Sequence, residues 1–126
     1  MCGIAGVFNS ERASQYAYLL VYSLQHRGQE SVGISSSEGK GIYTVKKPGK
    51  VLESITKEDL AYLKGDKAVA HVRYSTAGGS GPSNAQPIVR ETPLGKVALV
   101  HNGNLVNYLS LRRRLEEQGV KFYYNS

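Results

Sequence analysis

Apolar and polar positions along the chain follow two spacings, and each spacing predicts a different element. Residues Cys2–Phe8 are apolar and separated by glycines, which predicts a buried strand whose backbone lies close to its neighbours. From Ala13 to Gln25 apolar residues recur at helical spacing, so we predict a helix with Ser10 or Ser14 as its N-cap. Its predicted buried face consists of Tyr16, Leu19, Leu20 and Leu24, and Gly28 is expected to stop it.

Two short strands with a turn-forming sequence between them follow this helix. Ser31–Ser36 and Gly41–Lys46 flank the turn at residues 37–40, which predicts a hairpin. The pattern over Val51–Leu63 predicts a second helical region. Within it, Thr56 has the properties of an N-cap ahead of an acidic first turn.

The second half of the chain begins with a predicted strand rich in valine and alanine, Lys67–Tyr74. A loop dense in glycine, serine and proline covers Ala77–Gln86, and its lack of a Gly-Lys-Ser/Thr ending argues against a phosphate-binding P-loop. Two more strands are predicted near Ile88–Glu91 and Val97–His101.

A last helix is predicted from Asn107 to near Gly119, with Leu111 and Leu115 on its inner face. Strands in hairpins with helices between pairs of them predict an antiparallel α+β fold instead of a parallel βαβ sheet. The run Phe122–Ser126 is β-prone and has no partner after it, so we expect the sheet to be unfinished there.

Composition indicates a folded protein. The 126 residues are 40% apolar and 21% charged, which suits one small domain or a piece of a larger one. The formal net charge of +6 raises the question of a nucleic-acid partner. The basic residues are scattered apart from two groups, around Lys46–Lys50 and at Arg112–Arg114, and no basic and aromatic motif is interleaved, so we interpret them as solvated surface.

The single cysteine, Cys2, excludes an internal disulfide framework and a cysteine-rich zinc site. His26, His71 and His101 lack the spacing of a metal site, so no metal is expected. No window approaches the roughly 20 apolar residues that span a bilayer, and no basic leader precedes the first apolar stretch. We therefore expect a cytoplasmic protein without a membrane partner.

Cys2 is also the main candidate for chemistry. Removal of Met1 would give Cys2 a free α-amino group with a pKa of about 7.7 to 8.0, able to take a proton from a thiol of pKa about 8.5. One residue would then supply both nucleophile and base. The alternative is that Cys2 is a small buried hydrophobe, and a Cys-His dyad of the thiol protease type also stays open.

Asn102 and Gly103, at the end of a predicted strand, are candidates for an oxyanion hole. The Asn102 side-chain amide and the Gly103 backbone N–H could converge on the oxygen of a tetrahedral intermediate. The alternative is an ordinary Asn-Gly turn. Arg73 lies where a strand opens into a loop and can bind a carboxylate with two parallel hydrogen bonds, or it can form a structural salt bridge. Arg27 follows a helix, where the helix dipole alone favours a cation.

Four segments together resemble the class II, N-terminal-nucleophile glutamine amidotransferases. They are MCGIAG at the start, HRGQES at 26–31, HVRYSTAG at 71–78 and HNGNL at 101–105. Within this class the pattern is most similar to the glutamine phosphoribosylpyrophosphate amidotransferase branch of purine synthesis. The resemblance implies an αββα sandwich of antiparallel sheets. It makes residues 1–126 the amino-terminal part of a glutaminase domain.

The resemblance also implies roles for individual residues. Cys2 would form a γ-glutamyl thioester, and Asn102 with Gly103 would make the oxyanion hole. The glutamine α-carboxylate would be held by Arg73 and Thr76, and Arg27 would order the loop over the site. Ammonia would pass to a phosphoribosyltransferase domain that this chain lacks.

That missing domain would also bind Mg²⁺ with phosphoribosylpyrophosphate, and the full-length protein would be a homo-oligomer. The family's aspartate for the substrate α-amino group, in an Asp-Ser/Thr-Glu context, would follow the strand at which the chain ends. Some members carry a propeptide before the cysteine, whereas only Met1 precedes Cys2 here. The sequence therefore leaves a second interpretation open, a catalytically silent fragment that acts in folding or assembly through its sheet edge.

Overall fold

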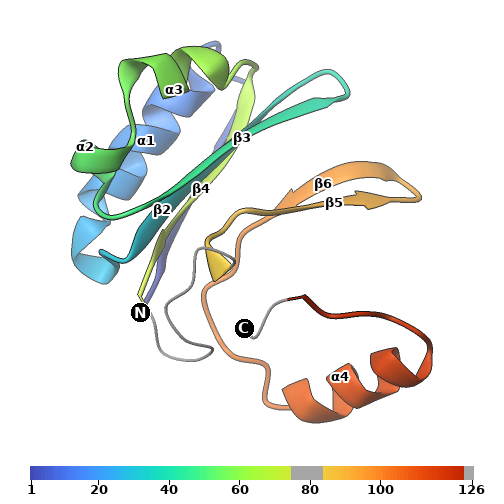
Figure 1. Ribbon diagram of the computed structural model, residues 1–126. Coiled ribbons are helices and arrows are strands. Elements are labelled where there is room, and N and C mark those ends of the chain that lie inside the picture. The colour runs from blue at the N-terminus through green and yellow to red at the C-terminus, as the bar shows by residue number, and fades with distance from the viewer. Residues whose placement is uncertain (75–83, 124–126) are drawn as a thin grey trace.

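The computed structural model describes residues 1–74 and 84–123. Its main element is a four-stranded antiparallel sheet in the order β1-β4-β2-β3. The strands are β1 (Gly3–Phe8), β2 (Ser31–Glu38), β3 (Gly41–Pro48) and β4 (Lys67–Arg73). The first and the fourth strand in sequence are therefore neighbours, and the start of the chain lies beside the end of β4 (Figure 1).

The predicted hairpin is confirmed and its strands are longer than expected. Glu38 pairs with Gly41, so Gly39 and Lys40 alone form the turn. Gly39 has φ +58°, a left-handed conformation that glycine adopts without strain. This geometry is typical of the tight turns that match the twist of two antiparallel strands.

Three helices cover one face of this sheet: α1 (Ala13–Ser23), α2 (Val51–Ser54) and α3 (Lys57–Tyr62) (Figure 1). A short 3₁₀ turn, η1 (Gln25–Arg27), follows α1 and ends at Gly28. Thr56 is the N-cap of α3 and forms a capping box with Asp59, as its position in the sequence predicts. The single region expected over 51–63 is therefore two short helices, separated by residues 55 and 56.

The predicted buried face of α1 is wrong. The helix buries Ala13, Ser14, Ala17 and Val21 against the sheet. Tyr16, Leu19 and Leu20 face outward and are 45 to 53% exposed, and Leu24 is only partly buried. Small side chains repeating every four residues let the helix axis approach the sheet closely, which larger side chains would prevent. The N-cap expectation is also wrong, because Arg12 occupies that position and Ser14 lies inside the helix.

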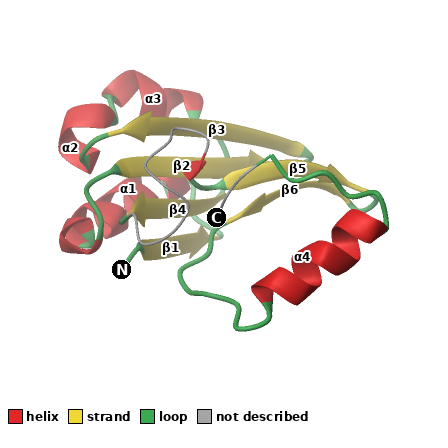
Figure 2. Ribbon diagram, turned by 60° about the horizontal axis from the view of Figure 1, so that its bottom comes forward, coloured by secondary structure: helices red, strands yellow, loops and turns green. Residues whose placement is uncertain are grey.

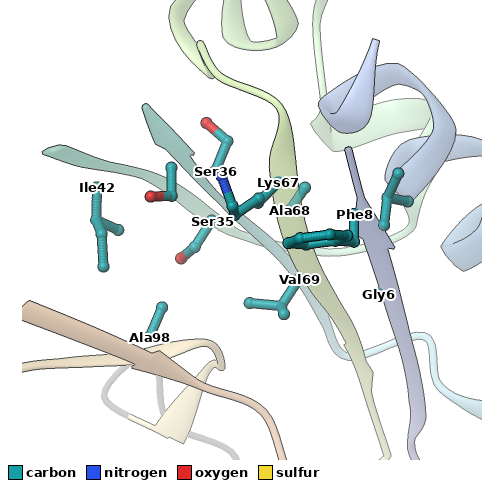
Figure 3. Close-up of a pocket in the computed structure, with 11 residues that line it drawn as sticks. Gly6, Phe8, Ser35, Ser36, Ile42, Lys67, Ala68, Val69 and Ala98 are labelled. Carbon is teal, nitrogen blue, oxygen red and sulfur yellow. The ribbon is translucent and has the colours of Figure 1, made fainter. Parts of the chain in front are cut away.

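A second, two-stranded sheet lies against the other face of the main sheet. It consists of β5 (Ile88–Thr92) and β6 (Gly95–Leu99) (Figures 1 and 2). Ala98 of β6 faces Ile42 and Val69 of the main sheet across a cavity of about 370 Å³ (Figure 3). The antiparallel α+β fold class is confirmed, with layers in the order helix, sheet, sheet.

The cavity also explains why β1 differs from its prediction. We expected a buried strand, yet Ile4 is 46% and Phe8 77% exposed, and of this strand only Gly3 is buried. Among the described residues β1 pairs with β4 alone, so it is an edge strand of the main sheet. Phe8 lines the cavity, and among the lining residues Ala98 alone comes from the second sheet, so the β5–β6 hairpin does not bury Phe8.

The last helix, α4 (Tyr108–Glu117), lies beyond the second sheet (Figure 2). Leu111 and Leu115 were expected to be on an inner face, but they are 37% and 38% exposed and the helix buries no residue. Arg112 bridges Glu116 and Tyr108 and lies 4.8 Å from the Phe122 ring centroid. Phe122 and Tyr123 lie outside any strand, and the rest of the predicted run is outside the described residues. No helix within the described residues is long and apolar enough to cross a membrane.

Candidate active site

Cys2 lies at the end of β4, because Gly3 pairs with Val72 in the antiparallel register. Its sulfur accepts a hydrogen bond from the Tyr74 backbone N–H at 3.4 Å and lies 3.5 Å from the Tyr74 carbonyl oxygen. The thiol is partly exposed, so it can meet a ligand from solvent. The sulfur thus contacts both the N–H and the carbonyl oxygen of Tyr74, which fixes its position at the end of β4. Within the described residues no histidine forms a hydrogen bond with Cys2.

Arg27 is brought to Cys2 by the 3₁₀ turn that follows α1. Its Nε donates a 2.8 Å hydrogen bond to the Cys2 carbonyl oxygen. The contact joins residues 25 positions apart in sequence and fixes the backbone that carries the thiol. The sequence-predicted residues Cys2 and Arg27 are therefore neighbours, although Arg27 contacts the main chain of Cys2 and not its sulfur.

Arg73, the last residue of β4, is buried and only 4% exposed. Its Nη1 donates to the Asn84 carbonyl oxygen at 2.8 Å, and its Nε lies 3.5 Å from a Glu30 carboxylate oxygen. Glu30 also donates its backbone N–H to the Arg73 carbonyl oxygen. Arg73 therefore forms a salt bridge, which was one of its two predicted roles. Its role toward a substrate carboxylate stays a prediction, as does that of Thr76, which lies outside the described residues.

A cavity of about 400 Å³ opens beside these residues, lined by His26, Gly28, Gln29, Glu30 and Tyr74. It adjoins Cys2 through Tyr74 and Arg73 through Glu30. Gly28 lies directly on the backbone of Arg73, and a Cβ there would overlap the Arg73 carbonyl group. Glycine at this position thus lets the 28–30 segment form a wall of the cavity.

Asn102 and Gly103 are exposed and follow β6 in a segment without regular structure. Gly103 has φ +153°. No hydrogen bond joins either residue to Cys2 in the part of the chain that the structure describes. Their link to the main sheet runs through His101, whose carbonyl oxygen lies 3.2 Å from Nε2 of His71.

His71, Gln86, Glu30 and Asn84 are the supporting residues that sequence patterns did not identify. His71 is completely buried, and burial holds its pKa at about 4, below the ordinary 6.5. The only sequence signal for His71 and Glu30 was their place inside the HVRYSTAG and HRGQES segments. Across residues 1–74 and 84–123 no three His, Cys, Asp or Glu side chains are placed to hold a metal ion.

Comparison with known proteins extends this description. Residues 71–126 match a glutamine amidotransferase domain family. Amidophosphoribosyltransferase 3 (chloroplastic) of Arabidopsis thaliana is 42% identical over 125 residues, and amidophosphoribosyltransferase of Bacillus subtilis is 44% identical over 126 residues. Both alignments cover 99% of this chain. The chain is therefore similar to glutamine amidotransferases along nearly its whole length.

Solved structures agree with this assignment. A structure described as an allosteric regulatory enzyme of purine biosynthesis superimposes with a TM-score of 0.90 at 41% identity, over 98% of this chain. A glutamine phosphoribosylpyrophosphate amidotransferase from B. subtilis, complexed with ADP and GMP, gives 0.89 at 39% identity. The α+β amidotransferase fold expected from the sequence is therefore confirmed. The chain spans about a quarter of the length of these relatives: 24% and 26% of the two sequences and 27% of each structure.

Proposed function

We propose that the chain hydrolyses the side-chain amide of glutamine through a thioester on Cys2, after removal of Met1. The observation that carries the proposal is the place of Cys2, whose sulfur accepts a hydrogen bond from the N–H of Tyr74, a residue that lines the 400 Å³ cavity. Met1 is 71% exposed, so an aminopeptidase can reach the bond before Cys2.

In the proposed mechanism the neutral α-amino group of Cys2 takes the proton of the thiol. The thiolate attacks the side-chain amide carbon of glutamine, and the carbonyl electron pair moves to oxygen. Asn102 and Gly103 stabilise this oxyanion by donating hydrogen bonds. When the intermediate collapses, the amide nitrogen takes the proton from the ammonium group and leaves as ammonia. Water then attacks the thioester, which releases glutamate and restores the thiol.

Substrate binding is assigned to the residues around Arg73. The guanidinium would hold the glutamine α-carboxylate with Thr76, because arginine offers several donors to a planar carboxylate. Arg73 already forms an ion pair with Glu30 and donates to the Asn84 carbonyl oxygen, so the substrate carboxylate would join an existing set of partners. Arg27 would order the segment over the site, consistent with its hydrogen bond to Cys2.

The larger setting is also part of the proposal. The chain would be the amino-terminal part of a glutaminase domain whose ammonia supplies phosphoribosylamine formation in purine synthesis. A phosphoribosyltransferase domain outside this chain would bind Mg²⁺ and phosphoribosylpyrophosphate, and the full protein would assemble as a homo-oligomer in the cytoplasm. The alternative is a fragment of that domain without activity, acting in folding or assembly through an exposed sheet edge. Strand β1 lies at an edge of the main sheet, and this edge position supports the alternative.

Glutamate release from glutamine tests the proposal. We expect release by this chain that Cys2→Ala reduces to background, while Ser23→Ala, an exposed change on α1, has no effect. Mass spectrometry should show that active protein has lost Met1 and that a γ-glutamyl adduct forms on Cys2. Background release by all three proteins would favour the silent fragment, and active protein that retains Met1 would exclude the α-amino base.

A further inference from the structure

His101 is held at both ends of its backbone by side chains from distant segments. Its N–H donates a 2.6 Å hydrogen bond to Oε1 of Gln86, and its carbonyl oxygen lies 3.2 Å from Nε2 of His71. His101 directly precedes Asn102 and Gly103, the candidate oxyanion donors. Two side chains thus fix the peptide groups from which the donors extend.

His71 lies in the main sheet, and Gln86 lies against that sheet just before β5. His71 lies in β4 and pairs with Gly33 of β2, so the two residues face the same side of the sheet. A Cβ on Gly33 would overlap the Gln86 carbonyl group, so glycine there lets the Gln86 backbone lie directly on the sheet. Gln86, Gly33 and His71 therefore meet at one level of the sheet, on the side facing the second sheet.

The contact between His71 and the His101 carbonyl oxygen also determines which ring nitrogen of His71 carries the hydrogen. A carbonyl oxygen can only accept a hydrogen bond, so Nε2 of His71 must carry the hydrogen. No described residue donates to or accepts from Nδ1, and the ring is fully buried. The low pKa of His71 keeps the ring neutral near pH 7, with the hydrogen on Nε2.

Asn102 and Gly103 need such support, because residues 101–110 are all exposed. Oxyanion donors lower the barrier only when they are held where the negative charge develops, and small displacements reduce the rate strongly. We propose that His71 and Gln86 are positioning residues that hold the His101 peptide and thereby fix the oxyanion donors of Asn102 and Gly103. This inference rests on the proposed function, since it assigns those two residues that role.

Substitution kinetics test the inference in the active chain. His71→Leu removes the donor, whereas His71→Gln can place an amide N–H near the position of Nε2. Gln86→Met likewise removes the acceptor at nearly constant shape, and Gln86→Glu retains one. We expect His71→Leu and Gln86→Met to lower kcat by about 10- to 100-fold with the KM for glutamine nearly unchanged, because the donors act mainly in the transition state. His71→Gln and Gln86→Glu should recover much of the rate.

Ile34→Val serves as the control for a general loss of stability. Ile34 is fully buried in β2, and its neighbour in the register is Ala70, so it faces the opposite side of the sheet from His71. Its kcat should stay within about twofold of the parent, because a single methylene lost from that core face leaves the His101 contacts intact. Equal kcat in His71→Leu and the parent, or an equal loss in Ile34→Val, would overturn the inference.

Nuclear magnetic resonance tests the same point without any activity. Long-range ¹H–¹⁵N spectra should show the hydrogen of His71 on Nε2, and His71→Leu should shift or broaden the Asn102 and Gly103 amide signals while Ile34→Val leaves them in place. A hydrogen on Nδ1, or unchanged signals in His71→Leu, would refute the inference even if the chain proves inactive. Background glutamate release with these spectral changes present would instead count only against the proposed function.

Discussion

The Nε of Arg27 donates a hydrogen bond of 2.8 Å to the carbonyl oxygen of Cys2. The side chain thereby connects the 3₁₀ turn after α1 to the residue just before β1. This backbone contact restricts the position of the candidate nucleophile without occupying its sulfur.

Loss of the contact should slow the reaction of the thiol. We expect Arg27→Met to lower kcat for glutamine hydrolysis by about tenfold, because a displaced nucleophile reaches the attack geometry less often. Steady-state glutamate release measures the effect. Arg12→Met, an exposed change at the start of α1, should stay near the parent rate. An unchanged rate for Arg27→Met would show that the contact has no catalytic role.

The ion pair between Glu30 and Arg73 should contribute to stability because Arg73 is buried. Glu30→Gln removes the charge of the Glu30 carboxylate from this pair, and we expect the free energy of unfolding to fall by about 1 to 3 kcal/mol. Urea denaturation measures this. The matched control is Glu91→Gln, which removes the exposed partner of Lys96 and should cost less than about 0.5 kcal/mol. Equal losses in both variants would show that burial of the pair is unimportant.

His71 should make stability depend on pH. Its pKa is lowered from 6.5 to about 4, chiefly by burial, with the charge of Arg73 acting in the same direction. The unfolded state therefore binds more protons between these values, so stability is complete above about pH 6.5 and decreases as pH falls toward 4. The loss approaches about 3 kcal/mol by pH 4. Urea denaturation at pH 7 and pH 4.5 should show a clearly smaller difference for His71→Gln than for the parent.

Local features of the fold were predictable because they depend on neighbouring residues. The hairpin turn at Gly39 and the N-cap of α3 at Thr56 each depend on residues within four positions, and both form as expected. The contacts between Arg27 and Cys2, and between His71 and His101, join residues 25 and 30 positions apart. No spacing rule indicates these contacts, so the residues that support the candidate site could not be predicted from the sequence.

The prediction of the buried face of α1 was wrong for a different reason. The hydrophobic pattern predicts that large apolar residues such as Leu19 and Leu20 are buried. The close approach of helix and sheet instead requires small residues at the buried face, here Ala13 and Ala17. We expect Ala17→Leu to destabilise the protein by about 1 to 3 kcal/mol through overpacking. Leu19→Ala, at an exposed position, should change stability by less than about 1 kcal/mol. Thermal unfolding distinguishes the two, and the reverse order would restore the face expected from the sequence.

We expect a substitution at Gly33 to be as damaging as a substitution of the side chains that it supports. A Cβ at this position would overlap the Gln86 carbonyl group, which belongs to backbone and cannot rotate away. Gly33→Ala must therefore push the Gln86 segment off the sheet, and the hydrogen bond from His101 to Gln86 should be lost with it. We expect a loss of about 1 to 3 kcal/mol in unfolding free energy.

Gly6→Ala provides the matched comparison, because a Cβ there meets no atom within 4 Å and strand β1 is otherwise unchanged. It should be neutral or slightly stabilising, since alanine loses less conformational freedom on folding than glycine. Hydrogen exchange at the His101 amide separates the two variants. Faster exchange is expected in Gly33→Ala alone, and equal exchange in both would mean that Gly33 does not hold Gln86 in place.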